Sequence, residues 1–451
     1  MSTPSQEFPP EITNLLTRIA DRNYTIGIVG LGYVGLPLAL TAVQQGFDVL
    51  GFDINGARVA DLNKGRSGIE HIDDKVIEAA VSAGKFRATD DFSELGKPDA
   101  ILIAVPTPLS KQREPDLVYV ERSAEAIALC LRKGQLVVLE STTWPGTTKE
   151  LVKPILEKAG LVCGDDFFLA YSPEREDPGN TEYQTRSIPK IVGADDAASR
   201  ALVGALYGTL ISEVVPVVSA ATAEAVKLTE NIFRSVNIAL VNELKLIYDK
   251  MDIDIWDVID AAKTKPFGFM PFYPGPGLGG HCIPIDPFYL TWKAREYEVA
   301  ARFIELAGEI NTAMPHHVIN KLASALDGSF SRGLNGSNIL VVGMAYKKNV
   351  DDMRESPSLK LIDLLAARSA NVEYHDPHIA EVPQTRSYPH MRGMKSVDLT
   401  PETLQSFDAV LISTDHDAID WALIVEHARL IVDTRNVCNR NGLFDGKIHK
   451  A

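Results

Sequence analysis

Short apolar runs alternate with amphipathic stretches through the first two hundred residues. The runs have strand length and lie at Tyr24–Val29, Asp48–Phe52, Asp99–Val105, Gln135–Glu140 and Phe167–Tyr171. Between them, helical spacing of the apolar residues predicts helices at Leu36–Gln45, Asp116–Leu131 and Thr147–Ala159. Strands that alternate with helices indicate a mostly parallel, doubly wound sheet.

The pattern changes between Ala220 and Met251, where neither proline nor glycine occurs. Apolar residues recur there at helical spacing, at Leu228, Ile232, Val236, Leu240, Leu244 and Ile247. This predicts one helix of about eight or nine turns. We expect its apolar stripe to pack in a core, and a helix of this length could also connect domains and form a dimer interface. A second helical stretch is predicted at Ala300–Leu326.

The alternating pattern returns after this helical region. Strands are predicted at Asn338–Val342, Asn371–Tyr374, Asp408–Ser413 and Leu430–Val432, with a helix at Ser356–Arg368. The fold class is therefore α/β, with two Rossmann-like doubly wound domains joined by a long central helix.

Length and composition are those of a multidomain globular protein. The chain has 451 residues, more than one hydrophobic core usually holds. It has no apolar run of membrane-spanning length, and Met1 to Pro10 lack the features of a signal peptide. A formal net charge of -15 argues against nucleic-acid binding. The four cysteines have neither disulfide-like nor metal-like spacing, so we expect reduced thiols and a cytoplasmic protein.

A glycine-rich turn follows the first predicted strand. Gly30-Leu31-Gly32-Tyr33-Val34-Gly35 has the spacing at which glycines form a tight turn, admit a pyrophosphate and pack a helix against a strand. The phosphates would meet the helix N-terminus. Asp53 ends the next strand about twenty residues later, where a ribose-binding acid belongs, and an acid there favours NAD over NADP. Arg58 could contact a phosphate or be a solvated surface residue.

A single thiol, Cys282, lies in the segment Gly275-Pro276-Gly277-Leu278-Gly279-Gly280-His281-Cys282-Ile283-Pro284-Ile285-Asp286. Such a loop is costly to order, because glycine loses much freedom on folding. Cys282 is either a covalent nucleophile beside a cofactor or a buried inert thiol.

Other polar residues are candidates for the same site. Lys227 and Asn231 lie four residues apart on one face of the long helix, and could share a site or be solvated. Asp286 could cap a loop or act in catalysis. Glu174 follows a strand end, where ligands of open α/β sheets gather.

Together these segments resemble the UDP-glucose/GDP-mannose dehydrogenases over nearly the whole chain. The cofactor turn and the Cys282 loop are similar to those of the family. Further segments that resemble family motifs are 223–231 around Lys227, 347–357 around Arg354, and Asp433-Thr434-Arg435-Asn436. The family carries a second glutamate four residues after Glu174, and this chain has Pro178 there.

The resemblance implies a role for each matching residue. The catalytic residues would be Cys282 as nucleophile, with Lys227, Asn231, Asp286, Glu174 and Thr142. NAD would be bound by Gly30, Gly32, Tyr33, Val34, Gly35, Asp53, Arg58, Thr107, Thr142 and Arg354, the last across a dimer. The sugar nucleotide would be bound by Glu174, Arg175, Lys227, Asn231, Phe272, Tyr273, Gly279, Lys347 and Arg435. No metal ligand is expected.

The implied reaction is a four-electron oxidation of a nucleotide-sugar alcohol to a carboxylate by two NAD, through a thiohemiacetal and a thioester on Cys282. The Cys282 loop most resembles the branch that acts on UDP-N-acetylglucosamine for bacterial surface polysaccharides. UDP-glucose, UDP-N-acetylgalactosamine and UDP-N-acetylmannosamine remain alternatives. Two other classes are a two-electron hydroxy-acid dehydrogenase and a non-catalytic nucleotide-sugar sensor.

The resemblance, the long apolar-striped helix and the net charge together give the expected domains and partners. We expect an N-terminal tail at 1–20, an NAD-binding domain at 21–215, a central helical domain with the Cys282 loop and the dimer interface at 216–330, and a UDP-sugar-binding domain at 331–451. A homodimer or higher even oligomer is expected, with no nucleic-acid or membrane partner.

Overall fold

The computed structural model describes residues 8–69, 72–110, 114–175, 185–280, 283–385 and 387–451. The chain forms two compact units. The N-terminal unit comprises Met1–Glu230 and Phe288–Val299, and the C-terminal unit comprises Asn231–Pro287 and Ala300–Ala451.

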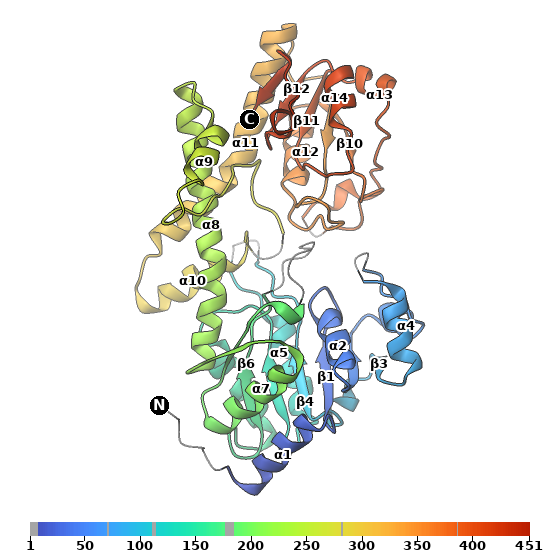
Figure 1. The fold of residues 1–451 in the computed structure, drawn as a ribbon, viewed down its shortest axis with the longest axis vertical. Helices are drawn as coiled ribbons and strands as arrows, with labels where there is room; N and C mark the ends of the chain where they lie inside the picture. The colour runs from blue at the N-terminus through green and yellow to red at the C-terminus, as the bar shows by residue number, and fades with distance from the viewer. Residues whose placement is uncertain (1–7, 70–71, 111–113, 176–184, 281–282, 386) are drawn as a thin grey trace. The chain divides into compact units, whose positions relative to one another are not determined.

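The N-terminal unit is built on a sheet of eight described strands in the order β3-β2-β1-β4-β5-β6-β7-β8. Its strands β1, β3, β4 and β6 are labelled in Figure 1. The strands are β1 (Thr25–Val29), β2 (Asp48–Phe52), β3 (Phe86–Thr89), β4 (Ala100–Ile103), β5 (Leu136–Leu139), β6 (Phe168–Tyr171), β7 (Lys190–Gly193) and β8 (Val214–Val217). The pairing of β6 with β7 is antiparallel, and the other described pairs are parallel. The first six strands follow the Rossmann order 3-2-1-4-5-6, which confirms the predicted doubly wound fold.

Helices cover this sheet. They are α1 (Pro10–Ala20), α2 (Gly35–Gln44), α3 (Gly56–Leu62), α4 (Asp74–Ser82), α5 (Val118–Ala128), α6 (Lys153–Leu156) and α7 (Ala197–Leu210). The predicted helix 147–159 is divided into a π-helical turn at Thr148–Val152, α6 and a final 3-10 turn. Pro154 cannot donate the backbone hydrogen bond that a regular helix needs at this point.

Helix α1 lies in the part of the chain where no element was predicted. Pro10 begins it, a position where the missing N–H costs nothing. Ile12, Leu15 and Ile19 are buried in the same core cluster as residues of α7, and α1 packs against α7. The cluster also takes in alternate residues of β1, because neighbouring strand residues face opposite sides of a sheet.

The C-terminal unit holds a second parallel sheet, in the order β10-β9-β11-β12-β13. Its strands are β9 (Asn338–Val342), β10 (Asn371–His375), β11 (Ala409–Ile412), β12 (Ile431–Asp433) and β13 (Ile448–Lys450). This is the 2-1-3-4-5 order of the flavodoxin-like doubly wound sheet. The C-terminal unit also holds the helices α9 (Ile255–Ala262), α11 (Arg302–Phe330), α12 (Pro357–Ala367), α13 (Pro401–Ser406), α14 (Trp421–His427) and α15 (Val437–Arg440). Helix α10 (Asp286–Ala294) belongs to the N-terminal unit from Phe288 onward.

The long central helix is confirmed as α8, which runs from Ala220 to Lys250. Helix α11 is also long, and its second half buries Val318, Ile319 and Leu322 in the core of the C-terminal unit. None of the helices among the described residues is both long and apolar enough to cross a membrane.

Candidate active site

The glycine turn after β1 is shaped by close contacts. Gly30 has a φ of 93°, and a Cβ atom there would lie 2.5 Å from the carbonyl oxygen of Ala104. A Cβ on Gly35 would lie 1.9 Å from the carbonyl oxygen of Gly30, whereas a Cβ on Gly32 would meet no atom within 4 Å. The first and third glycines are thus required by the fold. The open space at the second, in front of the N-terminus of α2, fits a bound pyrophosphate.

Asp53 and Arg58 hold this turn from the neighbouring strand β2 and helix α3. The Asp53 carboxylate accepts hydrogen bonds from the N–H of Leu31 at 3.0 Å and of Asn55 at 2.9 Å. Arg58 Nε donates to the carbonyl oxygen of Leu31 at 2.6 Å. The turn and the acid therefore lie side by side as the NAD hypothesis requires. A phosphate contact by Arg58 remains a prediction.

The other residues predicted to bind NAD lie on loops or turns. Tyr33 and Val34 are half-buried in the glycine turn, and Thr142 is half-buried after β5. Thr107 is buried after β4, and its carbonyl oxygen accepts a hydrogen bond from the Tyr289 hydroxyl at 2.7 Å. The ends of β4 and β5 are adjacent in the sheet, so Thr107 and Thr142 follow neighbouring strands.

Lys227 and Glu174 meet within the N-terminal unit. Lys227 is 7% exposed, and its Nζ donates to the backbone carbonyl oxygen of Glu174 at 2.5 Å. The neighbouring Arg175 forms an ion pair with Glu230 of α8 at 2.6 Å. Lys227 is thus buried rather than solvated. Helix α8 contacts the segment after β6 through Lys227 and Glu230.

A cluster of ionisable residues beside Glu174 was not predicted. Lys190 Nζ lies 2.7 Å from Glu140 Oε2 and 3.3 Å from Glu174 Oε2, and the Tyr207 hydroxyl donates to Glu140. Burial alone would lower the pKa of Lys190, but Glu140 and Glu174 raise it, so Lys190 is a cation. Lys190 and Glu140 interrupt apolar runs of the sequence, which is the one signal that could have indicated them.

Glu224 is a second buried acid that was not predicted. It lies on the first turns of α8 and is fully buried. Its carboxylate accepts hydrogen bonds from Gly146 N–H, from Thr148 N–H at 2.8 Å and from the Thr148 hydroxyl at 2.7 Å. Burial raises its pKa to about 7 despite these bonds. Glu224 thereby ties the loop that contains Thr142 to the helix that contains Lys227.

Asn231 and Asp286 form a pair within the C-terminal unit. They are 3% and 1% exposed, and Asn231 Nδ2 donates to Asp286 Oδ2 at 2.6 Å. Asp286 is the first residue of α10. Cys282 lies outside the described residues, as does Pro178, so their predicted roles stay predictions.

The first part of the Cys282 loop, 275–280, packs closely against other residues of the C-terminal unit. The Gly280 N–H donates to the carbonyl oxygen of Arg354 at 3.0 Å. A Cβ on Gly279 would lie 2.6 Å from Tyr346 Cβ, and one on Gly275 would lie 2.7 Å from Arg435 Nη1. The glycines are therefore needed for close approach.

Two buried amides anchor the start of this loop. The N–H of Gly275 donates to Asn242 Oδ1 at 3.1 Å, and Asn242 Nδ2 donates to Asn311 Oδ1 at 2.9 Å. The amide of Asn311 donates in turn to the carbonyl oxygen of Ser235 at 3.1 Å. The loop, α8 and α11 are thus linked by one chain of hydrogen bonds.

The predicted sugar-nucleotide residues of the C-terminal unit have different settings. Arg435 donates from Nε to the Ser413 carbonyl oxygen at 2.7 Å, and burial lowers its pKa. Phe272 packs edge-on against Phe233, with ring centroids 5.9 Å apart. Lys347 is half-buried in the segment after β9.

Two further predicted residues lie at least partly at the surface. The Tyr273 hydroxyl donates to Asp260 at 2.6 Å, and Arg354 forms an ion pair with Asp352 at 2.6 Å. The side chain of Arg354 is 43% exposed. Within its own chain, Arg354 therefore has a surface position that leaves its predicted contact across a dimer untested.

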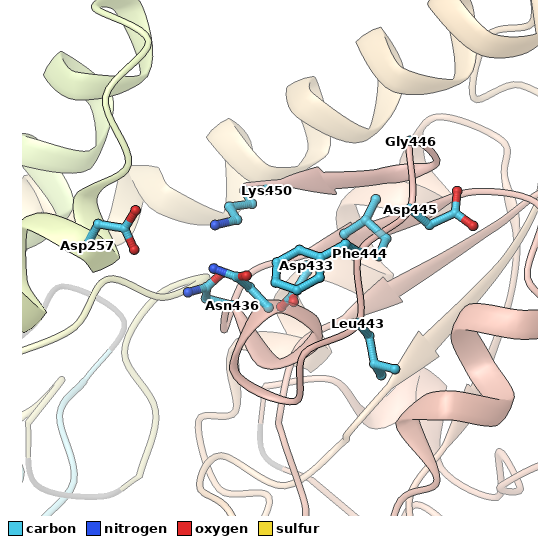
Figure 2. A pocket seen from close by; sticks show the side chains of 10 residues that line it. Asp257, Asp433, Asn436, Leu443, Phe444, Asp445, Gly446 and Lys450 are labelled. Carbon is cyan, nitrogen blue, oxygen red and sulfur yellow. The ribbon is translucent and has the colours of Figure 1, made fainter.

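A cavity of about 690 Å³ lies beside β12 and β13 (Figure 2). It is lined by Asp257, Asp433, Asn436, Asn439, Leu443, Phe444, Asp445, Gly446, Ile448 and Lys450. Three aspartates and a single lysine among these residues do not suit a diphosphate. None of the predicted sugar-nucleotide residues lines this cavity.

Models of one family match three successive parts of the chain. They are described as the NAD-binding, central and UDP-binding domains of the UDP-glucose/GDP-mannose dehydrogenase family, and match residues 24–211, 221–313 and 340–440.

Individual relatives match over most of their length. The chain is 35% identical to an NDP-N-acetyl-D-galactosaminuronic acid dehydrogenase of Ralstonia solanacearum, with 92% of this chain and 96% of the relative covered. It is also 35% identical to a UDP-N-acetyl-D-glucosamine 6-dehydrogenase of Pseudomonas aeruginosa, with 88% and 91% covered. A solved structure of a UDP-D-ManNAc dehydrogenase from Pyrococcus horikoshii superposes with a TM-score of 0.83 at 32% identity, covering 94% of this chain and 98% of that one.

Proposed function

Since the chain belongs to the UDP-glucose/GDP-mannose dehydrogenase family and is an NAD-dependent UDP-sugar dehydrogenase, we propose that it oxidises the C6 hydroxymethyl of a UDP-N-acetylhexosamine to the uronic acid. UDP-N-acetylglucosamine is the proposed substrate, and surface polysaccharide synthesis the proposed use of the product. The relatives named above each carry an N-acetylated sugar in their names. Their identities to this chain are nearly equal. They therefore support a class of substrate, the UDP-N-acetylhexosamines, and do not single out one sugar.

The oxidation needs two hydride acceptors, and NAD bound at the turn 30–35 supplies this chemistry. The residues of the chain do the rest. Lys227 and Asn231 are buried polar donors one turn apart on α8, a spacing that lets two side chains face the same ligand. Such donors stabilise the oxyanions that develop at a carbonyl carbon under attack.

Cys282 would add to the aldehyde formed in the first oxidation. An aldehyde has to gain a nucleophile before it can lose a second hydride, and a thiolate is the strongest nucleophile among the protein side chains. The thiohemiacetal then becomes a thioester, which water hydrolyses. Glu174 or Asp286 is the type of residue that takes the proton from this water.

The close packing of the loop segment 275–280 is the observation on which this proposal depends. The segment lies against Arg435 and Tyr346, and its Gly280 N–H donates a hydrogen bond to the Arg354 carbonyl oxygen. Arg435 lies in one of the segments that we assign to UDP binding, and Tyr346 directly precedes the other, which begins at Lys347. We propose that Lys347 and Arg435 hold the UDP. The proposed mechanism requires the Cys282 thiol to reach the sugar of a UDP-sugar bound at these residues.

The proposed domain organisation divides the chain at 21–215, 216–330 and 331–451, with 1–20 as an N-terminal extension. The three family matches at 24–211, 221–313 and 340–440 support these limits. The central segment would carry the Cys282 loop and the contacts between subunits.

The test is an assay of purified protein with a panel of UDP-hexoses, in which NADH formed is compared with sugar consumed. We expect two NADH per sugar and the fastest turnover with UDP-N-acetylglucosamine. Cys282→Ser should lose at least about a thousandfold in overall oxidation while it keeps its melting temperature. One NADH per sugar with accumulated aldehyde, or full activity of the variant, would refute the mechanism.

A homodimer is proposed from the surface of α8 and α11. Phe233, Leu240 and Ile247 are each close to half exposed, at 50%, 50% and 47%, and their spacing of seven places them on one stripe of α8. Phe303 of α11 is 79% exposed. Apolar stripes of this kind fit a second copy of the chain. Light scattering at micromolar concentration should give twice the chain mass or an even multiple, and a monomer would rule this out.

A further inference from the structure

Lys190 lies in the interior of the N-terminal unit, between two carboxylates from different strand ends. It is the first residue of β7 and is 5% exposed. Glu140 directly follows β5, and Glu174 follows β6. The lysine is 2.7 Å from Glu140 and 3.3 Å from Glu174.

Glu140 is a permanent partner of this lysine. Its side chain is fully buried, and its second oxygen accepts a hydrogen bond from the Tyr207 hydroxyl of α7. Lys190 Nζ also lies 5.3 Å from the centre of the Tyr207 ring. Lys190 is thus fixed in place from β5 and α7, independently of Glu174.

Stability does not explain such a cluster. Moving ionised groups out of water costs several kcal/mol each, and apolar residues of similar volume often stabilise a core equally well or better. The cluster instead lies next to one functional group. Glu174 is 16% exposed in its side chain, and its backbone carbonyl oxygen binds Lys227.

We infer that Lys190 is a positioning residue, which holds the carboxylate of Glu174 ionised and correctly oriented to act as the base in thioester hydrolysis. This inference rests on the proposed function. In the step concerned, the oxygen of water bonds to the thioester carbon and its proton passes to Glu174. The carbon–sulfur bond then breaks, the Cys282 thiolate leaves, and the sugar acid is released.

Other charged groups around Glu174 would remain when Lys190 is changed. Lys227 and Glu230 approach from α8, Arg175 is the next residue in the chain, and Glu140 and Tyr207 approach from β5 and α7. Loss of Lys190 would remove the cation that lies 3.3 Å from the Glu174 carboxylate. A carboxylate that loses a nearby cation becomes harder to ionise.

The experiment compares Lys190→Met, Lys190→Arg and wild type in single-turnover and steady-state assays between pH 5 and 9. At saturating UDP-sugar, the first NADH should form at the wild-type rate in all three, because the base is needed only in the hydrolysis step. For Lys190→Met, we expect the acidic limb of the steady-state rate to move up by about one pH unit, with a loss that approaches tenfold only at pH values below the wild-type limb. Lys190→Arg should restore most of the wild-type profile, because it keeps the charge.

Two controls separate positioning from folding. Lys245 is a second buried lysine, paired with Asp249 in the C-terminal unit, so Lys245→Met tests the general effect of removing such a group. The double variant Glu140→Gln/Lys190→Met removes both charges of the buried pair, so neither Glu140 nor Lys190 is left as an unpaired buried charge. This double variant should show the same upward shift as Lys190→Met.

Three results would overturn the inference: an unshifted acidic limb in the double variant, an equal loss in the first oxidation, or a similar shift in Lys245→Met. A wild type that gives one NADH per sugar would instead refute the proposed function. With two NADH per sugar and an unshifted limb, only the role of Lys190 fails.

Discussion

The two sheets of this protein build the same turn at the end of their first strand. Gly30 follows β1 and Gly343 follows β9, with φ angles of 93° and 89°. A Cβ at either position would collide with the neighbouring strand end, 2.5 Å from the Ala104 oxygen or 2.4 Å from the Thr414 oxygen. In both cases an acid after the adjacent strand accepts hydrogen bonds from the turn.

The two acids, Asp53 and Asp376, differ in how many hydrogen bonds their carboxylates accept. Among the described residues, Asp53 accepts two backbone N–H groups and is half-buried. Asp376 is 3% exposed, and it accepts hydrogen bonds from the N–H groups of Met344, Ala345, His378 and Ile379 and from the ring of His416. A carboxylate has about four acceptor sites, so Asp376 is saturated.

The turns also lead to different structures. The N-terminal turn opens directly into α2 at Gly35, so free N–H groups point at the turn. In the C-terminal unit, the segment that contains Lys347 separates the turn from α12, which starts at Pro357. The N-terminal arrangement suits a dinucleotide. In the C-terminal unit, Asp376 instead holds the start of the loop that carries Lys347 and Lys348. An acid after the second strand therefore does not identify a dinucleotide site by itself.

Of the predicted effects, the loss of stability on replacing Asp376 should be the largest. Asp376→Asn would turn two of its acceptor sites into donors facing backbone N–H groups in the interior, so we expect a loss of about 3–5 kcal/mol in unfolding free energy of the C-terminal unit. Urea unfolding followed by circular dichroism measures this loss. Asp53→Asn is the matched control, with an expected loss below about 1 kcal/mol. Equal losses would remove the distinction between the two turns.

The same variant should change the response to acid. Burial raises the pKa of Asp376, but His416 and the backbone N–H groups outweigh it and lower the pKa below its ordinary value. A lowered pKa gives stability that is present above the unfolded-state pKa and is lost as pH falls through the folded-state pKa. The difference between wild type and Asp376→Asn should thus narrow below about pH 4.

Replacing Asp53 should affect NADH binding more than it affects the free energy of unfolding. Asp53→Asn loses the charge that we propose accepts the ribose hydroxyls, so we expect NADH to bind about tenfold more weakly, as measured by calorimetry. The preference against NADPH should also decrease, because less repulsion of the 2′-phosphate remains. Asp376→Asn, assayed where it is folded, should bind NADH as wild type does. Weaker NADH binding by Asp376→Asn would contradict the comparison.

Much of this fold could be predicted from the sequence, because long apolar runs determined it. β2 and β9 have the predicted limits, and α8 differs from the prediction by one residue. The strands that were not predicted are short or polar, such as β8 with Pro216 or β3 with Arg87. Such segments form strands because a neighbouring strand provides backbone hydrogen-bond partners. The local pattern of apolar and polar residues does not show this.

The candidate site was only partly predictable for the same reason. The glycine turn and Asp53 are linked by a fixed spacing, so the sequence was enough to pair them. Lys190 and Glu140 are fifty residues apart, and they meet only because the ends of their strands lie at one edge of the sheet. Their contact is a consequence of strand order, and a single sequence does not specify strand order at β7.

The smallest expected effect concerns the carbonyl groups of the two turns. Arg58 Nε donates to the Leu31 oxygen at 2.6 Å, and the Thr414 hydroxyl donates to the Ala345 oxygen at 2.7 Å. Each contact is one hydrogen bond, so Arg58→Met and Thr414→Val should each cost about 1 kcal/mol. For Arg58→Met, which loosens a turn at the dinucleotide, the cost should appear as NADH binding weakened roughly threefold to fivefold. For Thr414→Val it should appear in unfolding alone, with NADH binding unchanged. Weaker NADH binding by Thr414→Val would mean that the two turns are not independent, and the division of roles between them would have to be abandoned.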